Sequence, residues 1–175
     1  MNFTNLDERT RVYMLDELEQ DEANHRVYFS PRLSQTGQSR WTDILRDAIQ
    51  HGDDASLAAT LRASGYLNAT LQRRKPSGGY STAQMPVNAP DTLAEGEFNR
   101  FYIRGVCLRA LADKIDHVIV YRAKAVEKPR AESEAKIGSS IDAQKVLDDL
   151  RVTQGIDTAL GLPAGANSGL SVKLP

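Results

Sequence analysis

The sequence has little of several things that would reveal a class of protein. It holds one cysteine, Cys107, so a disulfide framework or a cysteine-based zinc site within a single chain is excluded, and Cys107 is expected to be a buried small hydrophobe. Aromatic residues make up only 6% of the 175 residues, which favours one domain with a modest core. No apolar run approaches the roughly 18 residues of a membrane helix, and the acidic N-terminal stretch lacks the pattern of a signal peptide. Neither membrane insertion nor secretion is expected.

The chain also lacks a net excess of positive or negative charge. The net charge of −1 provides no global field that would draw the chain to nucleic acid or to an anionic membrane. The charges are nevertheless uneven, because residues 1–24 hold seven acids and two bases, whereas residues 100–130 hold eight bases and three acids. These two stretches can attract each other within one molecule or between neighbouring copies, and the sequence leaves both arrangements open.

Motifs that carry chemistry are absent as well. The chain has no Walker loop, no HExxH, no CxxC and no calcium-binding loop. The sequence therefore predicts no catalytic residue, no cofactor and no metal site, and a protein that is not an enzyme. One alternative is a hydrolase or nuclease in which His117 works with Glu95 and Glu97 as an acid/base cluster, with Arg100 and Arg104 nearby to hold a phosphate.

What is present is a long apolar stretch from Pro90 to Lys124. Its spacing predicts a helix apolar on most sides, capped at Asp91 or Thr92, followed by a β-branched strand over 118–121. Glu97, Arg100 and Arg104 recur at three- and four-residue spacing and are expected to form a narrow polar stripe at the surface. The fold class that follows is α+β: a mostly helical small domain with a central buried helix against a small sheet.

The flanking segments complete that prediction. A first helix is expected over 5–20, and an αα-hairpin over 41–65 that is broken at Gly52. Residues 80–87 are expected to form an edge strand that pairs with 117–123. A last helix is expected over 141–150, capped by the Gly-Ser-Ser run at 138–140.

The final residues differ from the rest of the chain. Residues 152–175 combine four glycines and two prolines with spaced leucines and only two charges, a composition typical of an extended arm that lies along a surface. The sequence thus predicts a compact domain over 1–151 and a C-terminal arm over 152–175, docked on its own domain or on a neighbour. The expected anchors are Leu160, Leu162, Pro163, Leu170, Val172 and Leu174, with Arg100 and Arg104 at an interface.

Two basic stretches are candidates for contact with nucleic acid. Arg73, Arg74 and Lys75 precede the flexible turn before Tyr80, and basic residues beside an exposed tyrosine can hold a backbone and stack a base. The second stretch is 122–130, which contains Arg122, Lys124, Lys128 and Arg130.

The segments EGEFNRFYIRGVCLRAL, VYRAK and SEAKIG resemble small uncharacterised proteins encoded by phages and prophages. The resemblance implies a virion component, such as a minor capsid, decoration or connector protein, found in the virion or the host cytoplasm. The expected function is therefore a non-enzymatic assembly protein that binds other subunits through its arm. The alternative from the same resemblance is a nucleic-acid-binding or host-directed regulatory protein of a mobile element.

Overall fold

The structure is a computed structural model that describes residues 1–153 and 168–175. Its elements, in chain order, are α1 (Glu8–Ala23), α2 (Gln35–His51), α3 (Asp54–Ala63), β1 (Thr70–Arg74), β2 (Tyr80–Gln84), α4 (Ala89–Ala112), β3 (His117–Arg122), α5 (Ala131–Glu134), β4 (Ser140–Asp142), α6 (Ala143–Val152) and β5 (Leu170–Lys173).

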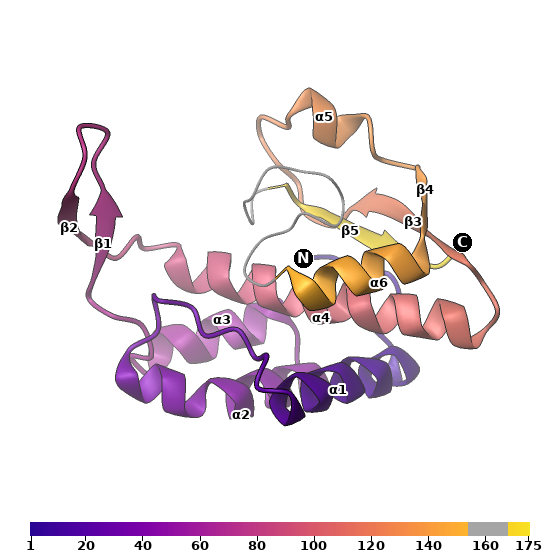
Figure 1. The fold of residues 1–175 in the computed structure, drawn as a ribbon, viewed down its shortest axis with the longest axis horizontal. Helices are drawn as coiled ribbons and strands as arrows, with labels where there is room; N and C mark the ends of the chain where they lie inside the picture. The colour runs from indigo at the N-terminus through magenta and orange to yellow at the C-terminus, as the bar shows by residue number, and fades with distance from the viewer. Residues whose placement is uncertain (154–167) are drawn as a thin grey trace.

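Helix α4 is the centre of the fold. It packs against α1 and α3 on one side and against α6, β3 and β5 on the other, so it lies between a layer of helices and a layer of mixed structure (Figure 1). The predicted α+β architecture with a buried central helix is confirmed. The hairpin β1–β2 extends away from this body, beyond the end of α4 at which the helix begins (Figure 1).

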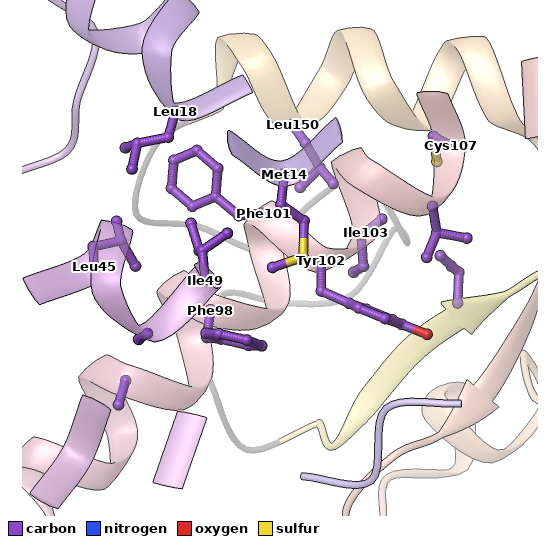
Figure 2. Packing of buried hydrophobic residues seen from close by; sticks show 14 of the residues in the cluster. Met14, Leu18, Leu45, Ile49, Phe98, Phe101, Tyr102, Ile103, Cys107 and Leu150 are labelled. Carbon is purple, nitrogen blue, oxygen red and sulfur yellow. The ribbon is translucent and has the colours of Figure 1, made fainter. Parts of the chain in front are cut away.

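The sequence of α4 explains its position. Pro90 stands in its first turn, where its missing N–H costs nothing, and Asp91 places negative charge at the positive end of the helix dipole. The helix begins two residues before the predicted cap. Figure 2 shows its aromatic side chains Phe98, Phe101 and Tyr102 among aliphatic residues of α1 and α2. In the part of the chain that the structure describes, no helix combines the length and the apolarity needed to cross a membrane.

The larger sheet is antiparallel in the order β4-β3-β5, with β3 in the middle. Val118 and Val120 of β3 are fully buried, as alternation in a half-buried strand requires. The predicted pairing of 80–87 with this strand is wrong, because β2 pairs with β1 instead. The turn between β1 and β2 has Gly78 and Gly79 at positive φ, a conformation that glycine adopts without strain. The loop that joins the two strands is therefore short, and closing it costs little conformational entropy.

The predicted cap of the last helix is also wrong. Residues 140–142 form β4, paired with the first half of β3, and the cap of α6 is Asp142, whose side chain accepts a hydrogen bond from the amide of Lys145 at 2.9 Å. Asp142 is therefore both the last residue of β4 and the N-cap of α6.

The end of the chain belongs to the core. Strand β5 pairs with β3, and Leu170 and Val172 have no exposed surface. Asn99 of α4 holds the strand in place, because its amide donates to the carbonyl oxygen of Leu170 at 2.9 Å and its side-chain oxygen accepts from the hydroxyl of Ser171 at 2.6 Å. Residues 170–173 are thus docked on their own domain, one of the two arrangements left open by the sequence.

The buried strand generates a stability prediction. Leu170→Ala is expected to lower the free energy of unfolding by about 2–5 kcal/mol, because a fully buried side chain would leave a cavity behind. Val152→Ala is the matched control, since Val152 is 82% exposed and its truncation should have little effect. Urea unfolding followed by circular dichroism measures both. Equal stability of the full chain and a chain ending at Arg151 would contradict this role of β5.

Candidate functional site

A cluster of buried charges lies where α1, α4 and α6 meet. The guanidinium of Arg104 donates from Nε to Oε2 of Glu17 at 2.6 Å and from Nη1 to Oδ2 of Asp21 at 2.6 Å. Arg151 of α6 donates from Nη2 to Oε1 of Glu17 at 2.5 Å. The side chains of Arg104 and Glu17 are 1% and 0% exposed, so this network is part of the interior.

The predicted surface stripe is therefore wrong. Glu97, Arg100 and Arg104 are all buried, because α1 covers the side of α4 on which they lie and supplies acids of its own. The acidic N-terminal stretch and the basic middle meet within one molecule. Arg100 and Arg104, proposed as interface residues, do not lie on the outer surface of the chain.

Burial and charge act in opposite directions on the carboxyls of this region. Burial raises the pKa of Glu17, but the hydrogen bonds from Arg151 and the charge of Arg104 outweigh it and leave the pKa below its usual value. Burial raises the pKa of Glu97 to about 7, and the charges of Arg100 and Arg104 only partly oppose it.

The cluster is best explained as a structural tie. Arg104 and Arg151 balance Glu17 and Asp21 in charge, and each of the four side chains has an internal partner at hydrogen-bond distance. No three His, Cys, Asp or Glu side chains within residues 1–153 and 168–175 are grouped so that they could hold a metal ion. Burial also raises the pKa of Cys107 to about 12, so this thiol is held in its protonated form.

The alternative acid/base centre is not assembled. His117 is hydrogen-bonded through Nδ1 to its neighbour Asp116 at 2.8 Å, and Glu95 is paired with Lys124 at 2.5 Å. Strand β3 begins beside the end of α4 and runs back along it, so that Lys124 reaches Glu95. Glu97 lies about 22 Å before the end of α4 at a rise of 1.5 Å per residue, which separates it from the start of β3.

The hairpin β1–β2 is the other candidate. Its strands pair in the register Thr70 with Gln84 through Arg74 with Tyr80, and all of its residues are exposed except for a half-buried set on one face. Arg73, Arg74 and Lys75 stand together at its tip, and Tyr80 is 70% exposed. The structure thus brings together the first group of predicted nucleic-acid residues.

The second basic group is used differently. Arg122 is paired with Glu134 and donates to the carbonyl oxygen of Ser168 at 2.7 Å, while Lys124 is paired with Glu95. Lys128 and Arg130 are exposed in the segment between β3 and α5. The two predicted groups therefore do not form one continuous patch.

The base of the hairpin is firmly held. The amide of Ser34 donates to the carbonyl oxygen of Tyr66 at 2.8 Å, and the side-chain amide of Asn68 donates to the carbonyl oxygen of Leu33 at 2.9 Å. A Cβ at Gly37 would lie 2.0 Å from the carbonyl oxygen of Tyr66, so only glycine allows α2 to approach this close. The chain therefore enters the hairpin from a fixed point of the body.

The remaining predicted contacts fall elsewhere. Leu160, Leu162 and Pro163 lie outside the described residues. Leu174 is partly buried, and its amide donates to the side-chain oxygen of Asn5 at 2.9 Å, so it contacts its own domain.

One signal in the sequence could have identified the hairpin as a unit. No acidic residue lies between Asp54 and Asp91, a gap that surrounds the three consecutive bases. The strand β1 was missed because its residues are mainly polar and carry no apolar alternation.

The buried tie generates a second prediction. Arg104→Ala is expected to lower the free energy of unfolding by about 3–5 kcal/mol, because Asp21 then stays buried without the guanidinium that binds it and Glu17 keeps only Arg151. Arg9→Ala is the control, since Arg9 forms an exposed pair with Asp113 that contributes little. Urea unfolding at neutral pH measures both variants, and an equally small loss in each would argue against the tie.

In comparisons with known proteins, no family model, no curated protein and no solved structure matches this chain. The projecting hairpin β1–β2, with its three consecutive exposed bases, is the candidate site that the residues of the chain themselves offer.

Proposed function

We propose that this protein is a non-enzymatic binding protein that contacts nucleic acid through the hairpin β1–β2. The observation that carries the proposal is a projecting hairpin whose only charges are positive. Arg73, Arg74 and Lys75 lie close together at its tip, and the nearest acid along the chain, Asp91, is paired with Arg62 at 2.7 Å. Consecutive bases at the end of an extended element can neutralise neighbouring phosphates, and phosphate neutralisation is the main source of affinity for nucleic acid.

The net charge of −1 does not oppose this proposal. Two of the acids in residues 1–24, Glu17 and Asp21, are buried in ion pairs, and Asp7 is paired with Arg109 at 2.6 Å. Because charges more than about 10 Å apart are largely screened at 0.1 M salt, the field near the tip is set by the tip itself. The local charge of the hairpin is therefore the relevant one.

The proposal predicts salt-dependent binding. Full-length protein is expected to bind a fluorescent duplex in anisotropy titrations, with a slope of log K against log salt of about −1.8 to −2.7 for two to three neutralised phosphates. Replacing Arg73, Arg74 and Lys75 together by alanine should remove most of this slope. The control replaces Lys128 and Arg130 by alanine and should leave the slope unchanged. Absence of binding to any nucleic acid at low salt would contradict the proposal.

Assembly with other subunits, as the phage resemblance implies, is a second candidate. The observation that favours it is that the hairpin forms a two-stranded sheet, so that within the described residues neither outer edge has a strand neighbour. Unpaired edges are templates for another strand, and the partner proposed here is the hairpin of a second copy, related by a two-fold axis.

This candidate predicts a defined dimer. Light scattering of the full chain should give twice the monomer mass, and replacing residues 71–83 by a short glycine–serine loop should give a folded monomer. A monomer in both cases would remove the edge-pairing candidate and leave nucleic-acid binding in place.

A further inference from the structure

One face of the hairpin carries an unusual set of side chains. Directly opposite residues of an antiparallel pair lie on the same face, and side chains alternate along each strand. The register therefore places six exposed residues together, which we name the polar face: Thr70, Gln72, Arg74, Tyr80, Thr82 and Gln84. Apart from one tyrosine, these are hydroxyl, amide and guanidinium groups, and none is acidic.

The central pair of this face is already oriented. The side-chain amide of Gln72 donates one N–H to the hydroxyl of Thr82 at 3.1 Å across the strands. A glutamine amide has two N–H donors and one carbonyl acceptor, so one donor and the acceptor remain. These are the two groups that a glutamine uses to bind N7 and the N6 amino group of adenine in the major groove.

We infer that the polar face reads base edges in the major groove of duplex DNA. The inference rests on the nucleic-acid binding proposed above, and it adds the form of nucleic acid and the residues that select its sequence. Gln72 reads adenine, Arg74 reads guanine, and Thr82 is a positioning residue for Gln72. Arg73 on the opposite face and Lys75 in the turn contact the phosphates beside the groove.

The dimensions of the hairpin agree with this assignment. Two paired strands are about 4.8 Å apart, and five residues span about 17 Å. The major groove of B-form DNA is about 12 Å wide and admits a two-stranded ribbon. Because the hairpin extends beyond the helical body, it can enter a groove while the body remains outside (Figure 1).

Other nucleic acids fit the polar face less well. Proteins that hold single strands stack successive bases on several aromatic side chains, and this face offers only Tyr80. Double-stranded RNA has a major groove too deep and narrow for side chains to read. Duplex DNA is the form whose accessible base edges match the amide, hydroxyl and guanidinium groups.

A protein partner fits less well too. The centre of a stable protein interface is apolar and rich in large anchors, whereas the centre of this face is the Gln72–Thr82 pair. The charge complementarity also favours a polyanion, because the only charges of the hairpin are the bases at its tip.

The test is a selection of full-length protein on a random 30-base-pair DNA pool, followed by anisotropy titrations on the selected duplex. An enriched motif that contains adenine and guanine is expected. Gln72→Ala should remove the preference for adenine at one position, a loss of roughly 5- to 150-fold in discrimination for one bidentate contact. Thr82→Val should weaken the same preference, whereas Lys75→Ala should weaken binding to all duplexes equally and keep the motif.

Ser81→Ala is the matched control, because Ser81 is in the same strand as Thr82 but lies on the opposite face of the hairpin. Its variant should select the wild-type motif. Thermal unfolding of every variant shows that the body is intact. Binding without an enriched motif, or tighter binding to a single strand or to duplex RNA, overturns the inference but keeps the proposed function. An enriched motif that survives both Gln72→Ala and Arg74→Ala also overturns it. No binding at low salt overturns the inference and the proposed function together.

Discussion

The buried ion cluster around Arg104 is the interaction on which the rest of the structure depends. It joins a helix from the beginning of the chain, the central helix and the last helix, because Arg104 and Arg151 both donate to the carboxylate of Glu17. Removing one partner from such a cluster leaves an unpaired charge in the interior, so α1 and α4 are held in one register. The cluster therefore favours the arrangement of helices in which every one of these charges keeps a partner.

This arrangement also decides where charge is available for binding. Arg104 and Arg109 of α4 are paired with acids of α1 and of its cap, and Lys124 and Arg122 after α4 are paired with Glu95 and Glu134. The hairpin is different, because its tip carries three bases and no acid. A chain with almost no net charge can thus present a strongly positive tip, because acids such as Glu17, Asp21 and Glu95 are paired with bases of the body and lie away from the hairpin.

The sequence predicts the parts of this fold that depend on local patterns. The central helix follows from its apolar residues and its acidic first turn, and the pair α2–α3 follows from its spacing and from Gly52. Two errors, the missed strand β1 and the cap of α6, are local, and the others concern contacts between distant residues. Arg104 looked like a surface residue because its partners, Glu17 and Asp21, are more than 80 positions away. Leu170 and Val172 have the pattern of arm anchors because the sequence predicts the strand at 118–121 but not its pairing with residues about 50 positions later. The basic tip was identified from its sequence, whereas its polar face was not, because a face exists only when β1 and β2 have a register.

The hairpin and the body therefore have separate physical requirements. A two-stranded sheet is marginally stable alone, so its shape depends on the anchored residues 66–68 and on the glycines of its turn. Holding the strands in register before a partner arrives lowers the entropy that binding must remove. The body needs buried charge pairs and a filled core, while the hairpin needs exposed polar groups on a fixed base. Substitutions on the polar face are therefore expected to leave the core intact, so that the proposed binding and the folding of the body can be measured separately.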